Sequence, residues 1–342
     1  MNTLRYRKFS QGMLTKRRDK ELKLVFTLLV LFFLFSCNEK HTGKQDPKLN
    51  PVETDAHREE LSGIQSFTDN DNSVIVIERP FTRIICLYSA HVENLFAIGA
   101  GSSVIGIPRE TDYPVEAMTL RTFDYNGDPE YVIAAEPDLV LIRPFVRRQS
   151  PDYIAEIEKA GIPVVSLYPE SFEDFDIYIL RLGMLTGKLE EAEEKLFAFH
   201  RELDEIQKNS DVIQDKKIVF FESTENQIRT VASDSLPAKA IGIAGGINAA
   251  PSLPPISQGS SIARFGAEAL LNIADSIDVY VVQQGAMNRT PNIEALRARA
   301  GFSAIKAIEE GQVLFINEKL ISSVTFRYLE GVRILSEFLY YH

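Results

Sequence analysis

The stretch LEEAEEKLFAFHRELDEIQKN, residues 189–209, decides the fold of this chain. It contains neither Gly nor Pro, and its apolar residues recur every three or four positions, which is the pattern of a long amphipathic helix. Blocks of alternating strand and helix patterns lie on both sides of it. We therefore expect a stiff helix over residues 188–210 that joins two lobes. Its predicted buried face consists of Ala192, Leu196, Phe199, Leu203 and Ile206.

The block before this helix, residues 61–187, has the pattern of an α/β lobe. Short apolar runs at 84–88, 104–107, 138–142 and 163–167 alternate with helical segments that end at Gly or Pro. Continuous apolar runs of this length are typical of strands buried on both faces, as in parallel sheets. A thiol within the first run, Cys86, is expected to be buried and structural.

The block after the helix, residues 211–342, repeats the same order of elements. Strand patterns at 217–221, 277–282 and 312–316 alternate with helical patterns, and a final helix is expected over 324–341. The fold class predicted for the whole body is therefore α/β: two three-layer α/β lobes with mainly parallel sheets, joined by a single long backbone helix.

The N-terminus has the features of a bacterial lipoprotein export signal. Four basic residues between positions 17 and 23 precede an apolar run at 24–35, which is too short to span a bilayer stably. Leu34-Phe35-Ser36-Cys37 then resembles a lipobox. We expect residues 1–36 to be a signal peptide and Cys37 to carry the acyl chains (palmitate among them) that form a membrane anchor. Polar residues 37–60 are predicted to be a disordered tether. An uncleaved anchor or an ordinary signal peptide is the alternative.

The charge and motif content exclude several functions. Only two of the 48 acidic residues but eight of the 37 basic residues precede Cys37, so the remainder has a net charge near −17, which repels nucleic acid. The chain has no G-x-S-x-G, HExxH, P-loop or G-x-G-x-x-G motif. We therefore expect no catalytic residues, no cofactor and no metal site, and predict that the protein is not an enzyme.

Four stretches, in order, resemble one family. Residues 83–99 are similar to its opening strand and "E-x-x-x-x-L-G" helix, and residues 128–141 to its "N-x-E-x-I-x-x-x-x-P-D-L-V" block. Residues 244–248 resemble its "A-G-G-x-N", and residues 307–313 its "A-V-x-x-G-R-V-Y". The family is that of the periplasmic binding proteins for iron–siderophore, haem and cobalamin import, and the resemblance covers about residues 80–342.

This resemblance implies a monomeric substrate-binding protein of an ABC importer, lipid-anchored and facing the periplasm or the cell exterior. It would capture an iron complex, either a ferric siderophore or haem, in a cleft between its lobes. Its partners would be an ABC permease and its ATPase. The membrane would be reached through the lipid anchor only.

Three candidate ligand-binding residues, Arg143, Phe145 and Arg147, follow the strand pattern at 138–142. In open α/β sheets ligands bind outside the carboxyl ends of strands. Guanidinium groups pair with carboxylate or catecholate oxygens and stack on rings, which suits a siderophore or a haem propionate. The alternative is a solvated loop whose arginines pair with acids such as Asp152 and Glu156.

Tyr113, Phe123 and Tyr125 are aromatic residues of a predicted loop on the same face. Exposed loop aromatics favour stacking on a flat ligand, and ordinary loop packing is the alternative. Residues 111–114 resemble the "S-D-Y-P" of the cobalamin-binding branch, which places tryptophans around the corrin. This chain has no Trp, so a corrinoid is the alternative cargo.

The second block supplies three more candidate ligand-binding residues. Glu222 and Gln284 end predicted strands and should line the opposite wall of the cleft. Arg327 matches an arginine that the family often carries near its last helix, where it either faces the cleft or bridges the lobes.

Two glutamates, Glu130 and Glu268, match the family positions, one per lobe, at which a surface acid docks onto arginines of the permease.

Two rival functions remain: a metal-ion binding protein, or a non-transport enzyme on a similar fold. A metal-ion binding protein needs several converging histidines and carboxylates. Only His91 and His200 precede His342 in the body of the chain, which is too few.

Overall fold

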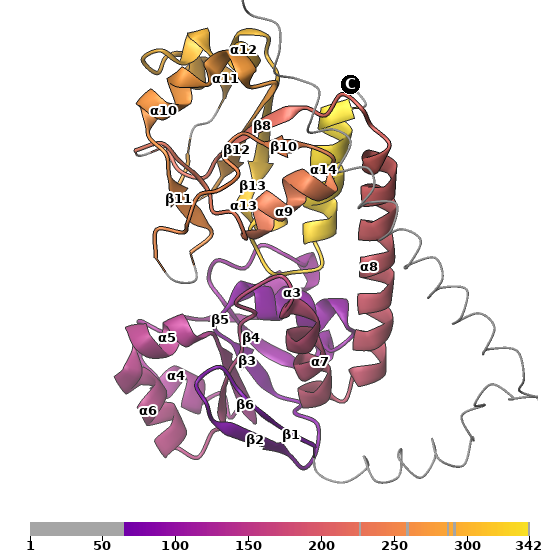
Figure 1. The fold of residues 1–342 in the computed structure, drawn as a ribbon. Coiled ribbons are helices and arrows are strands. Elements are labelled where there is room, and N and C mark those ends of the chain that lie inside the picture. Colours follow the sequence, from indigo (N-terminus) through magenta and orange to yellow (C-terminus); the bar gives the residue numbers. More distant parts are fainter. Residues whose placement is uncertain (1–64, 226, 258–259, 286, 290–291, 341–342) are drawn as a thin grey trace, which may run out of the picture. The chain divides into compact units, whose positions relative to one another are not determined.

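The computed structural model describes residues 65–225, 227–257, 260–285, 287–289 and 292–340 (Figure 1). Contacts divide the chain into Met1–Glu60 and Leu61–His342. The predicted signal peptide over 1–36, the lipidation site at Cys37 and the tether over 37–60 all lie outside the described residues.

The N-terminal lobe is built on a five-stranded parallel sheet in the order β5-β4-β3-β6-β7. Every residue of β3 and β6 is buried. Strands covered on both faces need apolar side chains at each position, which explains why these segments read as continuous apolar runs. The strands are β3 (Ile84–Cys86), β4 (Val104–Pro108), β5 (Arg121–Phe123), β6 (Leu139–Ile142) and β7 (Val164–Ser166).

Helices cover both faces of this sheet (Figure 1). Ile84 and Leu139 pack in one hydrophobic cluster with α3 and α7, whereas Ile85 and Val140 pack in another with α4, α5 and α6. Cys86 is a free and buried thiol, as predicted. An antiparallel hairpin, β1 with β2, precedes the sheet. The remaining elements of this lobe are β1 (Gln65–Thr68), β2 (Val74–Ile77), α3 (Ser89–Ala97), η1 (Gly101–Ser103), η2 (Val115–Thr119), α4 (Glu130–Ile133), α5 (Pro144–Gln149), α6 (Pro151–Lys159) and α7 (Phe175–Thr186).

The long helix is α8 (Leu189–Asp211), which starts after Gly187 in the left-handed conformation. Ala192, Leu196, Phe199 and Leu203 are buried along one face of it, as the helical period predicts. The helix packs against α7 of the N-terminal lobe and against α9 and α14 of the C-terminal lobe (Figure 1).

The C-terminal lobe has a four-stranded parallel sheet in the order β10-β8-β12-β13. Phe220 and Tyr280 pack on one face, and Phe221 and Val281 on the other. A two-stranded antiparallel sheet, β9 with β11, lies beside it. The strands are β8 (Ile218–Glu222), β9 (Arg229–Val231), β10 (Ile247–Asn248), β11 (Ile262–Arg264), β12 (Val279–Gln284) and β13 (Val313–Asn317).

The last helix begins later than the sequence pattern predicts. We expected a helix over 324–341, but α14 starts at Tyr328. The carbonyl of Val324 and the N–H of Phe326 are instead hydrogen-bonded to the side chain of Asn94. Residues 322–327, which we call the junction loop, are therefore irregular. The helices of this lobe are α9 (Leu236–Ile243), α10 (Ala267–Asn272), η3 (Ala274–Ser276), α11 (Ile293–Arg297), η4 (Phe302–Ala304), α12 (Lys306–Glu309), α13 (Glu318–Ile321) and α14 (Tyr328–Tyr340).

Within the described part of the chain, no helix combines the length and the apolar character that crossing a membrane requires.

Candidate functional site

Three side chains follow neighbouring strands of the N-terminal sheet. Tyr88 lies two residues after β3, Arg143 directly follows β6, and Tyr168 lies two residues after β7. Because β3, β6 and β7 are adjacent and parallel, these positions meet at one edge of the sheet. The guanidinium carbon of Arg143 lies 4.7 Å from the Tyr88 ring centroid, and the Tyr88 and Tyr168 centroids are 6.1 Å apart. We call Tyr88, Arg143 and Tyr168 the N-edge group.

The guanidinium of Arg143 contacts aromatic rings rather than acids. Besides Tyr88, the Phe145 ring centroid lies 4.8 Å from its guanidinium carbon. Among the residues that the structure describes, no carboxylate forms an ion pair with Arg143. Ring faces attract a cation without neutralising its charge. Among the described residues, the positive charge of Arg143 is therefore not neutralised by an acid.

The two phenols of the N-edge group are neutral at ordinary pH. Burial raises the pKa of Tyr88 and of Tyr168, and the nearby Arg143 cation only partly opposes that rise. A neutral phenol donates a hydrogen bond through its O–H. The group as a whole thus offers hydrogen-bond donors and one positive charge, which suits a ligand rich in acceptor oxygens.

A pocket of about 700 Å³ adjoins this group at Tyr168. Residues 168–172, which follow β7, line it from the N-terminal lobe. The C-terminal lobe contributes residues 232–236, 251–255 and 260–261, together with Ser322 and Val324 of the junction loop. Because both lobes line this pocket, it is a cleft between them. Its volume lies within the range of small-molecule sites.

Tyr113 and Arg327 are brought together, but away from Arg143. The Arg327 guanidinium carbon lies 4.2 Å from the Tyr113 ring centroid, and its nitrogens lie 3.6 Å from Glu93 and 3.8 Å from Glu330. Tyr113 and Glu93 belong to the N-terminal lobe, whereas Arg327 belongs to the junction loop. Arg327 therefore contacts the other lobe, and it also lines a second pocket together with Glu93 and Tyr113.

Phe123 and Tyr125 pack in the protein rather than in an exposed loop. Phe123 is 4% exposed, and a Cβ on Gly106 would lie 2.3 Å from its ring. Tyr125 is half-buried against the same hydrophobic cluster. The expectation of an exposed aromatic loop is therefore wrong for Phe123, because its side chain fills the space that Gly106 leaves open.

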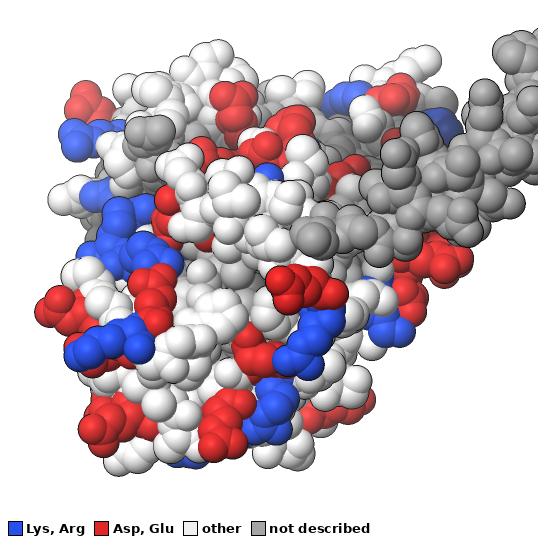
Figure 2. All heavy atoms as spheres, turned by 90° about the horizontal axis from the view of Figure 1, so that it is seen from below, with Lys and Arg blue, Asp and Glu red and all other residues white. Residues whose placement is uncertain are grey.

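Arg147, four residues after Arg143, has its charge neutralised by two acids. Its guanidinium forms ion pairs with Asp71 at 2.7 Å and with Glu158 at 2.9 Å. These are not the acids that the sequence suggested. The face of the molecule in Figure 2 likewise shows basic groups beside acidic ones. We therefore leave Arg147 out of the candidate site.

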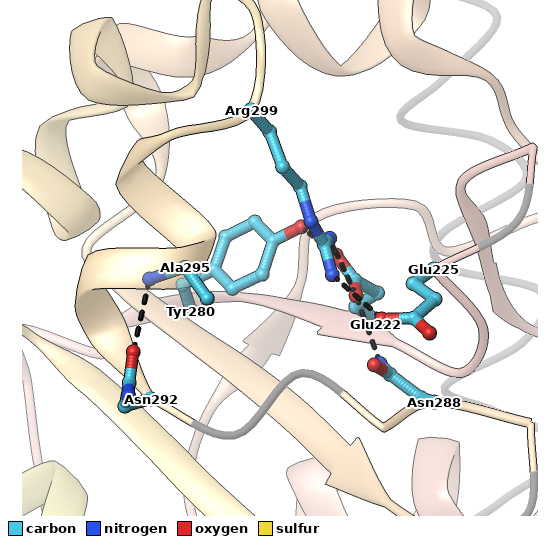
Figure 3. Close-up of polar contacts among 7 residues, drawn as sticks. All are labelled: Glu222, Glu225, Tyr280, Asn288, Asn292, Ala295 and Arg299. Carbon is cyan, nitrogen blue, oxygen red and sulfur yellow. Dashed lines mark hydrogen bonds and ion pairs between the residues drawn. The ribbon is translucent and has the colours of Figure 1, made fainter.

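Glu222, at the end of β8, points into the C-terminal lobe. Its side chain is fully buried and accepts hydrogen bonds from Tyr280 at 2.5 Å, Asn288 at 2.8 Å and Arg299 at 2.8 Å (Figure 3). All of these donors belong to its own lobe, so the predicted ligand role does not fit its position. Gln284 ends β12 and is half-buried.

Glu130 and Glu268 are both exposed. Each lies in the first turn of a short helix, Glu130 in α4 and Glu268 in α10, one in each lobe. Both carboxylates are thus accessible on the surface.

Sequence reasoning missed Tyr88, Tyr168 and Glu93. The signal for both tyrosines was present, since each comes two residues after a buried strand of the same parallel sheet. Glu93 gave no such signal, because only the folded chain brings it near Arg327. Among the described residues, no group of three His, Cys, Asp or Glu side chains is placed to hold a metal ion.

Comparison with known proteins identifies the family of the chain. The family model for "Periplasmic binding protein" matches residues 84–320, which is more than half of the chain. The chain is 26% identical over 277 residues to the uncharacterized ABC transporter substrate-binding lipoprotein YvrC of Bacillus subtilis (strain 168). That match covers 80% of this chain and 84% of the relative.

Two further similarities concern proteins named for their ligands. The vitamin B12-binding protein of Vibrio campbellii is 28% identical over 171 residues, which are 49% of this chain and 61% of that protein. The periplasmic heme-binding protein RhuT from Roseiflexus sp. RS-1 superimposes with a TM-score of 0.63 at 19% identity, covering 75% of this chain and 97% of that chain. This structural likeness confirms the predicted fold of two α/β lobes.

Proposed function

The chain belongs to the periplasmic binding protein family, and from this premise we propose that it carries an iron complex, either haem or a ferric siderophore. It is a substrate-binding protein of an ABC transporter, acts outside the cytoplasm and performs transport rather than catalysis. Its partners are accordingly a permease, an ATPase and a small-molecule cargo.

Arg143 is the observation that carries the proposal for an iron complex. It is a cation without an acidic partner among the described residues, at the carboxyl ends of the sheet strands, in a group whose Tyr168 lines a cleft of about 700 Å³. Haem propionates and siderophore catecholates or carboxylates are anionic oxygens, which a guanidinium binds in a bidentate manner. The rings of Tyr88 and Phe145 supply flat apolar surface beside that charge.

A panel of cargoes tests this proposal. The full chain, purified in detergent, is titrated by calorimetry with haem, a ferric tricatecholate, a ferric hydroxamate and cyanocobalamin. We expect submicromolar binding of one iron complex and weaker binding of cyanocobalamin. Failure of all three iron complexes to bind would contradict the proposal.

A corrinoid is the second candidate cargo. It is favoured by the similarity to vitamin B12-binding proteins and by Tyr113, a residue that is 42% exposed. The absence of Trp argues against it, because a corrin needs broad apolar or aromatic walls. Tighter binding of cyanocobalamin than of any iron complex in the same panel would select this candidate instead.

We also propose that the protein is held at a membrane by acyl chains on Cys37. The support is the basic and apolar segment that precedes Leu34-Phe35-Ser36-Cys37, together with the similarity to a protein named as a lipoprotein. Multiple acyl chains anchor a protein stably where a single chain does not. Mass spectrometry of the mature N-terminus should find an acylated Cys37, and a mature protein that retains residues 1–36 would contradict the anchor.

Glu130 and Glu268 are proposed to dock the two lobes onto the permease. Both are exposed, and two acids at a fixed separation register a partner with matching basic residues. Charge reversal at both positions, Glu130→Lys with Glu268→Lys, should abolish uptake and leave cargo affinity unchanged. Reversal of the exposed Glu309 and Glu337 serves as the control, and normal uptake by the Glu130→Lys, Glu268→Lys variant would exclude docking through these residues.

A further inference from the structure

The two lobes are connected by a second link besides α8. The junction loop, residues 322–327 of the C-terminal lobe, contacts α3, α7 and α8 through its own backbone and side chains. The ring of Phe326 lies 5.3 Å from that of Phe175 and 5.6 Å from that of Phe199. Just before the loop, Lys319 reaches the carbonyl of Glu110 at 2.6 Å and the carboxylate of Asp112 at 2.9 Å.

Asn94 makes the central contact of this link, and both the nitrogen and the oxygen of its side-chain amide are hydrogen-bonded. Its Nδ2 donates to the Val324 carbonyl at 2.9 Å, and its Oδ1 accepts from the Phe326 N–H at 3.3 Å. The side chain therefore pairs with the loop backbone as a neighbouring strand would. Asn94 has no exposed surface, so water does not replace these bonds when they break.

A chain of buried hydrogen bonds leads from Asn94 to the N-edge group. Asn94 also donates to the Tyr178 hydroxyl at 3.2 Å, and Tyr178 contacts His91 Nδ1 at 2.9 Å. The other ring nitrogen of His91 lies 3.0 Å from the carbonyl of Ile142, the residue before Arg143. Asn94 is thus linked both to the junction loop and to the strand end that carries Arg143.

Glu93, the neighbour of Asn94, makes an incomplete contact with the same loop. Glu93 Oε2 lies 3.6 Å from the Arg327 guanidinium, which is beyond hydrogen-bond length. Glu93 Oε2, Thr325 Oγ1 and Arg327 Nε are all buried without a hydrogen-bond partner. Unpaired buried groups are costly, so a small approach of Arg327 to Glu93 is favourable. A pocket of about 480 Å³, lined by all three residues, leaves room for that movement.

We propose that Asn94 is the pivot on which the two lobes move and that Glu93 with Arg327 is the latch that holds them together. The satisfied contact stays fixed while the unsatisfied one shortens whenever the lobes approach one another, with or without cargo. Glu93 and Asn94 are positioning residues, since neither lines the cleft of the N-edge group. The latch acts between the lobes whichever cargo is carried.

Spin-label distances between the lobes test the latch in the absence of cargo. Ser102→Cys and Ser303→Cys place one label on each lobe of the full chain, in which Cys37→Ser removes the other thiol and the buried Cys86 stays unlabelled. We expect Glu93→Gln to broaden the distance distribution at least twofold. Glu330→Gln, which removes the exposed acid 3.8 Å from the same arginine, should leave it unchanged. Equal widths in Glu93→Gln and the parent protein would overturn the latch.

Asn94→Leu tests the pivot, because it keeps the approximate size of the side chain and removes both the donor to the Val324 carbonyl and the acceptor of the Phe326 N–H. Amide exchange at Phe326 should accelerate more than tenfold in this variant. Asn70→Leu is the matched control, since Asn70 holds the backbone of Tyr168 in the same way within one lobe, and it should leave exchange at Phe326 unchanged. Unchanged exchange at Phe326 in a folded Asn94→Leu variant would overturn the pivot. If that variant does not fold, Tyr178→Phe, which removes the hydroxyl next to Asn94, should raise the same exchange rate. No change in Tyr178→Phe would then overturn the pivot.

Discussion

The carboxyl ends of the two parallel sheets carry charges of opposite sign in different surroundings. In the N-terminal lobe, Arg143 follows β6, contacts the rings of Tyr88 and Phe145, and forms no ion pair with a carboxylate of the described residues. In the C-terminal lobe, Glu222 ends β8 and accepts hydrogen bonds from Tyr280, Asn288 and Arg299 (Figure 3). Among the described residues, the charge at one sheet edge has no acidic partner, whereas the charge at the other edge is neutralised within the lobe.

This difference teaches that a position at a strand end does not by itself make a residue a ligand contact. What matters is whether the protein already supplies the partners of the charge. Glu222 is completely buried with three donors, so it stabilises the lobe, whereas Arg143 is half-buried and has no acidic partner among the described residues. Substitutions at the two edges should therefore change different quantities, stability at one and cargo affinity at the other.

The largest effect is expected at Glu222. Glu222→Gln should lower the free energy of unfolding by about 3 to 5 kcal/mol, because it leaves Arg299 without its buried carboxylate. Urea denaturation measures this change. Glu225→Gln, which removes a half-buried acid 3.3 Å from the same arginine, should cost less than about 1 kcal/mol. Similar losses in the two variants would contradict an internal role that is special to Glu222.

A smaller effect is expected from pH at His91, which lies beneath the N-edge group with its ring 5.2 Å from that of Tyr88. Burial lowers the pKa of His91 to about 4. The unfolded chain therefore binds this proton at a higher pH than the folded chain. The contribution of neutral His91 to the free energy of unfolding is fully present above a pH of about 6.5. It is lost as the pH drops toward 4, by up to about 3 kcal/mol. Urea denaturation at several pH values should show this dependence of the free energy of unfolding on pH. In His91→Gln, the slope should correspond to about one proton fewer taken up on unfolding. An unchanged slope in His91→Gln would show that His91 is not buried in its neutral form.

The smallest effect in free energy is expected at Arg143. Arg143→Gln should weaken the binding of an anionic cargo at least tenfold, which is about 1.4 kcal/mol, and hardly change the unfolding midpoint. Arg147→Gln is the matched control, because its charge is already paired with Asp71 and Glu158. It should alter cargo affinity less than twofold in the same calorimetric titration. A larger loss of affinity in Arg147→Gln than in Arg143→Gln would reverse the assignment of the two arginines.

The elements predictable from the sequence are those governed by local periodicity. The buried face of α8 follows from the helical repeat, and β3 and β6 follow from apolar runs that a covered parallel sheet requires. Arg143 at a strand end follows from the same pattern. Contacts between residues far apart in the sequence could not be predicted from local periodicity. Asn94 and Val324 are 230 residues apart, so the start of α14 could not be placed from the sequence around it. Phe123 was misjudged because its burial depends on Gly106 in a neighbouring strand.

A crystal structure of the full chain with the iron complex that binds most tightly tests the central claim most directly. The account predicts an anionic oxygen of that complex within about 3 Å of the Arg143 guanidinium, with the rings of Tyr88 and Tyr168 against it. A complex bound in the separate pocket lined by Tyr113 and Arg327, with no contact to Arg143, would contradict it.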